Sequence, residues 1–454
     1  MIKRATGRLL VALGVGAVVF AGTGGATGAP TAVHAAGTTT VAAQVSVESA
    51  ARKPTWRPTQ GGKFNVPRVG GDKQYRLEKQ VVSAIRHARK GSQIKISLFS
   101  FDRFPVADAL IAAHRRGVDV KVLMNDHEEP RAQKKLRRVI GKNRSKRSYI
   151  YQCQNGCRST GENNHSKFFL FSHTGAARDV VMVGSVNMKL NGSKNQYNDL
   201  WTKNDAPALY ATFDDLFRRM RPDKVDKPTY MRREIGKNFM LQVTPFHNEG
   251  PDNDPIDTVL DPVKCKGARG GTGTNGRTLI RVNMHAWNGR RGTYLAERFR
   301  KLYAAGCDVK LQYGYAGKLV RDEFGIKTPR GYMPIRANGF DTDGDEETDL
   351  YSHMKLLIIT GNYGGDRSAK VVVTGSSNYQ DSGVRGDEVI LRMLNQDRTT
   401  AQYLKNWKWM WENRTREVPH VQPKRSTDRF GRPLPERRVY LAGPGIDSPE
   451  WEDE

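Results

Sequence analysis

The chain contains one short pattern twice, and this repetition constrains its fold more than any other feature. The stretch "NNHSKFFLFS" covers residues 163–172 and "YSHMKLLIIT" covers residues 351–360. Alternate residues of an extended strand point to the same face, so a histidine and a lysine two positions apart project together. The apolar run that follows each pair is typical of a strand buried on both faces. The pattern therefore predicts two equivalent strands that each begin with a paired histidine and lysine: His165 with Lys167, and His353 with Lys355.

The similarity extends well upstream of these pairs. "HRRGVDVKVLMN" and "YAAGCDVKLQYG" each end an amphipathic helix with a glycine and then start a strand rich in β-branched residues. Gly117 stands 48 positions before His165, and Gly306 stands 47 positions before His353. We therefore expect an α/β fold of two tandem units, each with a central mixed β-sheet flanked by helices. A pseudo-twofold axis should relate the units and bring both histidines into one shared active site.

A second motif follows each pair after one further strand. "GSVN" and "GSSN" each combine a glycine, which permits close approach of the backbone, with a hydroxyl and a carboxamide. Lysine contributes a point charge, and neutral donors contribute directed hydrogen bonds, so the doubled set could hold one phosphate group. The candidate phosphate ligands from this motif are Ser185, Asn187, Ser376 and Asn378.

One carboxylate stands at the start of the next strand in each copy. Asp199 lies in "QYNDLW" and Glu388 lies in "RGDEVILR". Each could hydrogen-bond the second ring nitrogen of the histidine in its own copy and so fix the tautomer and orientation of the ring. The alternative is that both are ordinary carboxylates at the end of a strand.

The doubled His-x-Lys and Gly-Ser-x-Asn pattern resembles the phospholipase D superfamily, from about Lys63 to Arg414. The resemblance implies that His165 attacks phosphorus and forms a phosphohistidine, while His353 protonates the leaving alcohol and then activates water or an acceptor alcohol. It also implies that the two lysines and the asparagines of the Gly-Ser-x-Asn motifs bind the phosphate oxygens. The lysines would neutralise the developing charge, so we expect no cofactor and no metal ion.

One departure from the family pattern occurs in both copies. The family usually carries an aspartate five residues after the lysine, and Ser172 and Thr360 stand at those places. A hydroxyl at this position can still bond to the backbone but adds no charge. We expect this change to bear on which subfamily the chain resembles more than on whether the chain is active.

The N-terminal residues are predicted to be a secretory signal peptide. Lys3, Arg4 and Arg8 precede an apolar stretch that is short for a bilayer span, and small residues follow it. An uncleaved anchor is the alternative. We expect a secreted, extracellular protein that is divided into a signal peptide (1–36), a leader (37–62), two phospholipase D-like units (63–235 and 236–416) and a C-terminal tail (417–454).

Four cysteines remain in the exported chain, and an even number favours disulfides in an oxidising compartment. We expect Cys153 to pair with Cys157 and Cys265 with Cys307, because each pair then stays within one unit. Zinc is the alternative, but the chain has only one short cysteine pair at ligand spacing.

The formal net charge is +27, and about +24 remains once the signal peptide is removed. Such a charge favours polyanionic partners, including phospholipid surfaces and nucleic acid, although it also serves solubility.

We expect a monomeric phosphodiesterase of lipid degradation that hydrolyses or transfers glycerophospholipids. Three tryptophans near the C-terminus should either touch lipid or pack a helix on the core: Trp407, Trp409 and Trp411. A metal-independent nuclease that uses the basic run at residues 134–147 is the alternative, and a non-catalytic polyanion-binding protein is the second. The acidic loop at residues 341–349 is expected to be solvated rather than to bind calcium.

Overall fold

The structure is a computed structural model that describes residues 55–158, 162–246, 250–345 and 348–418. The expected signal peptide, most of the leader and nearly all of the C-terminal tail lie outside these ranges. Within the ranges, no helix is both long and apolar enough to cross a bilayer.

The first half of the described chain is built on a seven-stranded mixed sheet with the strand order β1-β8-β6-β5-β2-β3-β4. Strands β2, β3 and β4, which lie at one end of the sheet, are parallel to one another, and β5 joins β2 in antiparallel fashion. The strands are β1 (Gly61–Phe64), β2 (Gln93–Leu98), β3 (Asp119–Asn125), β4 (Tyr149–Cys153), β5 (Phe168–Thr174), β6 (Ala177–Gly184) and β8 (Asp199–Lys203). The helices of this half are α1 (Gly71–Gln74), α2 (Arg76–Arg86), α3 (Phe104–Arg115), α4 (Arg131–Ile140), α5 (Leu190–Lys194) and α6 (Pro207–Met220).

The second half repeats this arrangement strand for strand. Its sheet contains the run β10-β18-β17-β16-β12-β13-β14, which has the same parallel and antiparallel pairings as the first sheet. The strands are β9 (Met231–Ile235), β10 (Phe239–Val243), β11 (Val263–Lys264), β12 (Leu279–Trp287), β13 (Asp308–Ala316), β14 (Ile335–Ala337), β16 (Lys355–Tyr363), β17 (Asp366–Gly375), β18 (Val389–Leu394) and β19 (Arg416–Glu417). The helices are α7 (Asp257–Leu260), α8 (Gly289–Ala304), α9 (Lys318–Phe324), η1 (Ser382–Val384) and α10 (Asp397–Asn413). The expected fold of two tandem α/β units is therefore confirmed.

The glycines that follow the equivalent helices α3 and α8 adopt similar backbone conformations. Gly117 has φ +88° and Gly306 has φ +107°, which residues with a Cβ atom rarely adopt. Each glycine lets the chain leave α3 or α8 and enter the next parallel strand directly. The hairpin of β9 and β10 crosses the boundary expected at residue 235, because β9 pairs with β10 and so belongs to the second sheet.

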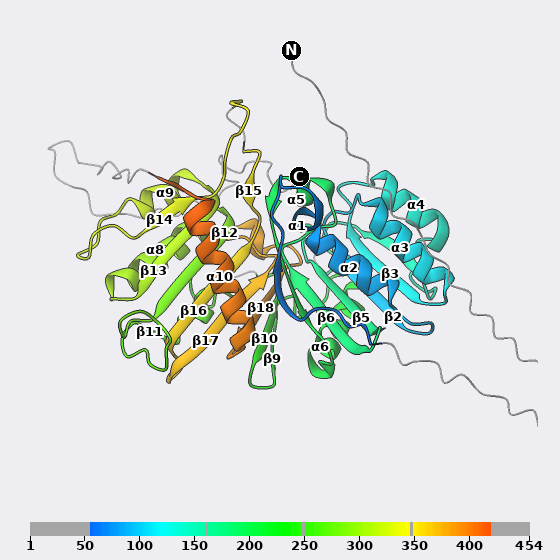
Figure 1. Cartoon of the computed structure of the whole chain (residues 1–454), viewed down its shortest axis with the longest axis horizontal. Helices are drawn as coiled ribbons and strands as arrows, with labels where there is room; N and C mark the ends of the chain where they lie inside the picture. The colour runs from blue at the N-terminus through cyan, green and yellow to red at the C-terminus, as the bar shows by residue number, and fades with distance from the viewer. Residues whose placement is uncertain (1–54, 159–161, 247–249, 346–347, 419–454) are drawn as a thin grey trace, which may run out of the picture. The chain divides into compact units, whose positions relative to one another are not determined.

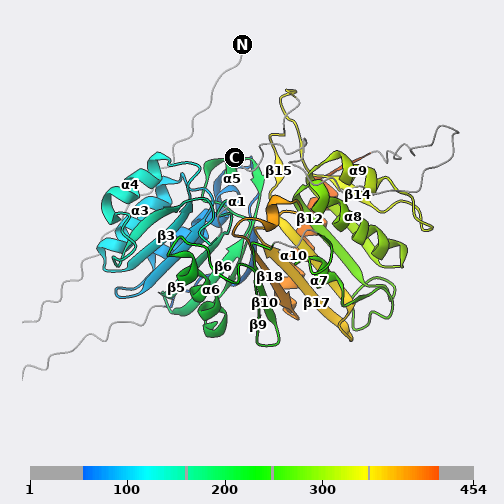
Figure 2. The same cartoon turned by 180° about the vertical axis from the view of Figure 1, so that it is seen from behind.

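Three apolar cores explain why the motif strands are buried on both faces. In β5, Phe169 and Phe171 pack with α2 and α3, whereas Phe168 and Leu170 face a core that also contains residues of β16 and α10. Leu356 of β16 lies in that shared core. Figures 1 and 2 show α10 lying across the second sheet while α2 and α3 cover the first. Trp407 is buried in the shared core and stacks on Trp411 at 5.1 Å between ring centroids, so Trp407 packs a helix rather than touching lipid.

Two short strands join the halves at the site. β7 (Gln196–Tyr197) comes from the first half and β15 (Tyr351–Ser352) from the second, and they pair in parallel. The residue after β15 is His353, whose backbone N–H donates to the carbonyl of Tyr197 at 2.9 Å. The mirror contact joins the N–H of His165 to the carbonyl of Asp387 at 3.1 Å. Each motif histidine is therefore anchored by the backbone of the opposite half.

Candidate active site

The four motif residues lie at the beginning of equivalent strands, and all are buried. His165 and Lys167 lie just before β5. His353 lies two residues before β16, and Lys355 is the first residue of that strand. Their exposed fractions are at most 5%. Each lysine ammonium donates to the backbone carbonyl of the histidine two residues before it, at 2.7 Å for Lys167 and 2.9 Å for Lys355. Because packing fixes the strands, these side chains are held in place before any substrate binds.

The hydrogen-bond acceptors of the two histidines come from the opposite halves. Nδ1 of His165 lies 2.8 Å from Oε1 of Glu388. Nδ1 of His353 lies 2.9 Å from Oδ1 of Asn198 and 3.1 Å from the carbonyl oxygen of Ser185. The site is therefore shared between the halves, and the acceptors are exchanged across it. The expectation that each carboxylate bonds the histidine of its own copy is wrong.

The expected role of Asp199 is also wrong, because this carboxylate does not reach a histidine. Its Oδ2 accepts hydrogen bonds from the hydroxyls of Thr374 at 2.6 Å and Tyr403 at 2.7 Å, and Oδ1 accepts from the N–H of Ser185. Strand pairing shows the reason. Gly184 pairs with Leu200 and Gly375 pairs with Ile390, so Glu388 corresponds to Asn198 rather than to Asp199. Asp199 joins the two halves, and one histidine has a carboxylate partner while the other has a carboxamide.

The motif serines stand behind these acceptors. The Ser185 hydroxyl donates to Oδ1 of Asn198 at 2.9 Å and accepts from the N–H of Asp199. The Ser376 hydroxyl accepts from the N–H of Val389 at 3.0 Å and also bonds to the Glu388 carboxylate. Both serines therefore orient the acceptor of a histidine, which differs from the phosphate contact expected for them.

The carboxamide oxygens of the two motif asparagines accept hydrogen bonds from the backbone. The carboxamide oxygen of Asn187 accepts from the N–H of Ser100 at 3.2 Å, and that of Asn378 accepts from the N–H of Ala286 at 3.4 Å. An amide whose oxygen accepts from the backbone turns its NH₂ group the other way. Both NH₂ groups are thus directed away from these backbone donors.

A third histidine, which the sequence analysis missed, packs against His353. The His285 ring lies 4.8 Å from the His353 ring and stacks on Tyr351 at 5.0 Å between centroids. The equivalent residue in the first half is Phe99, whose ring meets His165 edge-on at 5.1 Å. No sequence signal identifies His285, because its surroundings "NMHAW" read as an ordinary buried strand.

Burial sets the ionisation of the site. Burial, followed by the nearby charges of Lys355 and His285, holds the pKa of His353 well below its usual range. Burial raises the pKa of Glu388 to about 7, although Lys167 opposes this shift. A buried carboxyl that retains a proton up to neutral pH can share that proton with the imidazole it bonds.

The hydroxyls that replace the motif aspartate bond to the backbone, as expected. The Ser172 hydroxyl accepts from the N–H of Gln93 at 2.8 Å, and the Thr360 hydroxyl accepts from the N–H of Gly273 at 3.2 Å. Both residues therefore anchor the far end of a motif strand.

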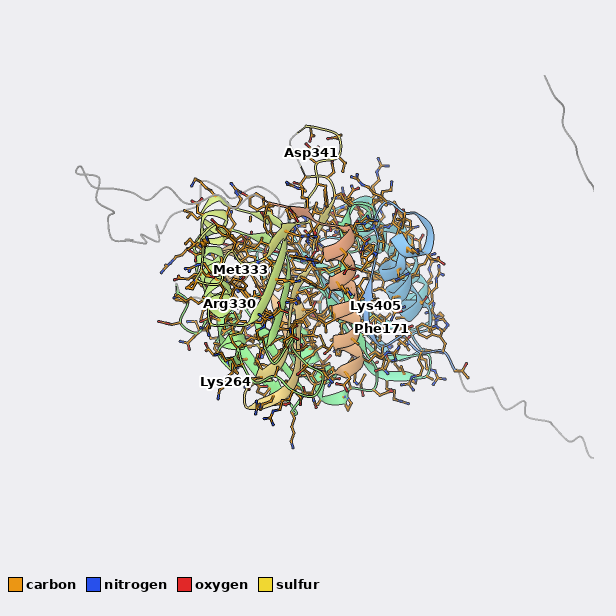
Figure 3. The ribbon with its side chains drawn as sticks, turned by 60° about the vertical axis from the view of Figure 1, so that its left-hand side comes forward. Phe171, Lys264, Arg330, Met333, Asp341 and Lys405 are labelled. Carbon is orange, nitrogen blue, oxygen red and sulfur yellow. A yellow bond between two sulfur atoms is a disulfide. The ribbon has the colours of Figure 1, made fainter. Side chains whose placement is uncertain are left out.

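Both expected disulfides are confirmed. Cys153 is bonded to Cys157, and Cys265 to Cys307, so none of the four holds zinc. The acidic loop brings the carboxylates of Asp341, Asp343 and Asp345 within 4.8 Å of one another, and all three are exposed. Figure 3 places Asp341 on the loop that projects beyond the second sheet.

Comparisons with known proteins agree with this architecture. A family model described as "Cardiolipin synthase, PLD-like domain" matches residues 81–221. No curated protein matches the chain by sequence. The structure is similar to phosphatidylserine synthase of Haemophilus influenzae Rd KW20, with a TM-score of 0.52 and 13% identity over 81% of this chain and 89% of that one.

Two other solved structures show weaker similarity. Polyphosphate kinase from Porphyromonas gingivalis has a TM-score of 0.49 and 14% identity over 82% of this chain, which spans only 53% of the kinase. Nuc of Salmonella typhimurium, a phospholipase D family member, has a TM-score of 0.28 and 18% identity over 36% of this chain and 94% of its own. The family-model match shows a phospholipase D-like domain at residues 81–221, and the second half of the chain repeats its motifs and its sheet.

Proposed function

We propose that the protein is a phosphodiesterase that works through a phosphohistidine on His165. The observation that carries the proposal is the difference between the two acceptors. His165 has the carboxylate of Glu388 on Nδ1, which stabilises the positive charge that its ring acquires when Nε2 bonds phosphorus. His353 has the neutral carboxamide of Asn198, which orients the ring but leaves its proton easier to release.

The proposed reaction has two steps. In the first, Nε2 of His165 forms a bond to phosphorus, the bond to the leaving oxygen breaks, and His353 gives its proton to that oxygen. Because burial lowers the pKa of His353 in the free protein, this step requires that the negative charge of the bound phosphodiester keeps the ring protonated. In the second, His353 removes a proton from water or an alcohol, the oxygen bonds phosphorus, and the bond to Nε2 breaks. Hydrolysis and transfer to an alcohol then differ only in the second nucleophile.

Four side chains would hold the phosphate during both steps. Lys167 and Lys355 supply positive charge from a buried position, where electrostatic interactions are stronger than in water. Asn187 and Asn378 supply their NH₂ groups from the two sides. In this proposal each half contributes one lysine and one asparagine to the bound phosphodiester.

We propose glycerophospholipids as the substrate class. The support is the family model matched at residues 81–221, whose description names a cardiolipin synthase, together with the net charge of the chain, which favours anionic lipid surfaces. The predicted signal peptide and the two disulfides support export to an oxidising compartment.

The experiment is an incubation of the purified exported chain with phosphatidylcholine vesicles and, separately, with plasmid DNA. Each reaction is run with and without a metal chelator, and His165→Ala serves as the matched control. Release of head group, abolished in the variant, supports the proposal. Cleavage of DNA alone would favour the nuclease, and no turnover of either substrate or of a nitrophenyl diester would contradict the enzymatic function.

A further inference from the structure

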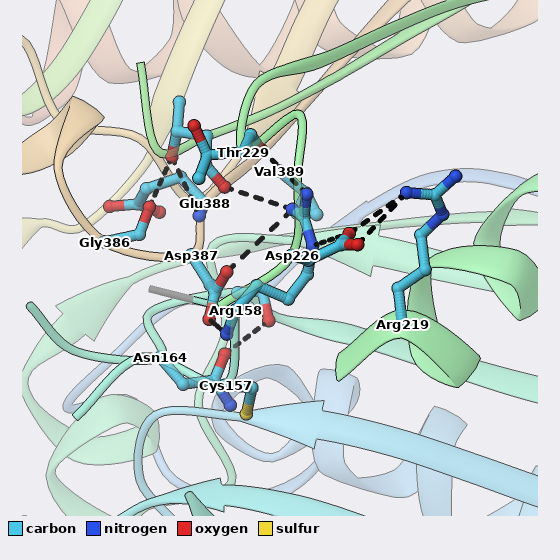
Figure 4. A network of polar contacts seen from close by, with 12 residues as sticks. Cys157, Arg158, Asn164, Arg219, Asp226, Thr229, Gly386, Asp387, Glu388 and Val389 are labelled. Carbon is cyan, nitrogen blue, oxygen red and sulfur yellow. Dashed lines mark hydrogen bonds and ion pairs between the residues drawn. The ribbon is translucent and has the colours of Figure 1, made fainter. Parts of the chain in front are cut away.

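The residue before Glu388 carries a buried carboxyl that the proposed reaction does not use. Asp387 is 1% exposed, and its Oδ2 accepts the backbone N–H of Arg158 at 3.0 Å. The backbone N–H of Cys157 also donates to it. Figure 4 shows these contacts, which join Asp387 to the residues at the end of the Cys153–Cys157 disulfide loop.

Arg158 compensates the charge of Asp387 from a position closed to solvent. Its guanidinium is fully buried, and Nη1 lies 3.9 Å from Oδ1 of Asp387. Nε donates to Asp226 at 3.0 Å, and Nη2 donates to the carbonyl of Thr229 at 2.7 Å. Arg219 in turn contacts Asp226 at 3.1 Å, so alternating charges form a row from the protein surface to Asp387.

The backbone of Asp387 holds the residues around His165. Its carbonyl accepts the N–H of His165 at 3.1 Å, and its N–H donates to the carbonyl of Asn163 at 3.0 Å. One residue thus anchors the backbone of the nucleophile and stands next to the carboxylate that bonds the nucleophile's ring.

The opposite half lacks a carboxyl at this place. Tyr197 is the equivalent residue, and its carbonyl accepts the N–H of His353 at 2.9 Å in the same way. The backbone anchor is therefore common to both halves, whereas the buried acid occurs only beside His165.

We propose that Asp387 is a positioning residue that adds negative charge beside the Glu388–His165 pair and makes this pair hold its proton more tightly. The inference rests on the proposed function, in which His165 must be unprotonated at Nε2 to attack. The other charged groups that face Glu388 are Lys167, Lys355 and Arg291, and those that face Asp387 are Arg158 and Glu388. Burial raises the pKa of Asp387 to about 7, and the charge of Glu388 contributes to this shift, so the two neighbouring carboxyls influence each other.

The test is the Asp387→Asn variant, which keeps an oxygen for the N–H of Arg158 and removes the negative charge. In this variant the Glu388–His165 pair should bind its proton less tightly. The loss of kcat/KM at acid pH should therefore move to lower pH by up to about one unit. Asp226→Asn is the matched control, because it removes a carboxylate from the same arginine without standing beside Glu388. Asp387→Ser is a second neutral variant in case Asp387→Asn does not fold.

The second readout is the NMR titration of the His165 Cε1–H signal, which is assigned with His165→Asn and needs no turnover. A lower midpoint in Asp387→Asn than in the wild type and Asp226→Asn supports the inference. An unchanged midpoint, or the same shift in Asp226→Asn, would overturn it and leave Asp387 a structural residue. If the wild type turns over no diester, the proposed function fails, and the NMR titration still decides the effect of Asp387.

Discussion

Glu388 accepts a hydrogen bond from His165 at 2.8 Å although 223 positions separate the two residues in the chain. The partner of His353 crosses the site in the opposite direction and is the carboxamide of Asn198. The two histidines therefore differ chiefly in what bonds Nδ1, and this difference leads to the first prediction.

Glu388→Gln should reduce kcat/KM by roughly 100- to 10,000-fold, because it keeps an acceptor for His165 and removes the charge that stabilises the phosphohistidine. Asn198→Asp should instead shift the alkaline loss of activity to higher pH, since a carboxylate stabilises protonated His353. Full pH profiles on one nitrophenyl diester and one natural diester measure both effects. Equal losses without a shift in either profile would contradict the assignment of roles.

Alanine variants of the two histidines should respond differently to the leaving group. His165→Ala removes the attacking nitrogen and should form no covalent intermediate on any substrate. His353→Ala removes the acid, a loss of about 100- to 10,000-fold that a nitrophenolate leaving group should largely relieve. Acid-quench trapping of phosphoenzyme accompanies the assay, and rescue of His165→Ala instead would reverse the two roles.

The stability of the protein should depend on pH through Glu388. Its pKa is raised from 4.5 to about 7 in the fold, so the stabilisation from binding this proton is complete below pH 4.5 and is lost as the pH rises through 7. Glu388→Gln lacks this dependence. Relative to the wild type, it should gain roughly 2–3 kcal/mol between pH 5 and pH 8. Calorimetric unfolding at both pH values measures the difference, and a constant difference would argue against a raised pKa.

The two disulfides should contribute unequally to stability. Cys265 and Cys307 close a separation of 42 residues, and Cys153 and Cys157 close one of 4. Loop-closure entropy predicts a loss of about 4 kcal/mol for the Cys265→Ala/Cys307→Ala double variant and about 2 kcal/mol for Cys153→Ala/Cys157→Ala. Denaturant titrations of both variants provide the comparison, and a larger loss for the shorter loop would show that local packing outweighs chain entropy.

The repeated fold could be predicted from the sequence because its signals are local and occur twice. The helix that ends at Gly117, the apolar run after Lys167 and their copies after Gly306 and Lys355 each indicate one element, and the matched spacing relates the copies. Burial of each motif strand on both faces also follows from its unbroken apolar run.

The partners of the histidines could not be predicted, because strand register decides them. Asp199 and Glu388 both precede an apolar residue and look equivalent, yet pairing across β6 and β17 makes Asn198 the counterpart of Glu388. A shift of one residue turns a side chain to the other face of a strand, and no local pattern reports it. Asp387 was missed because its role depends on Arg158, which lies in the other half.

The crossed acceptors also bear on why the two units share one chain. A symmetric dimer of identical single units would place the same acceptor beside both histidines, so either ring could attack. Covalent fusion lets the two copies diverge, and here one carries Glu388 where the other carries Asn198. If His165 is the attacking residue, as proposed, the orientation in which a substrate enters would follow from the order of the two halves along the chain.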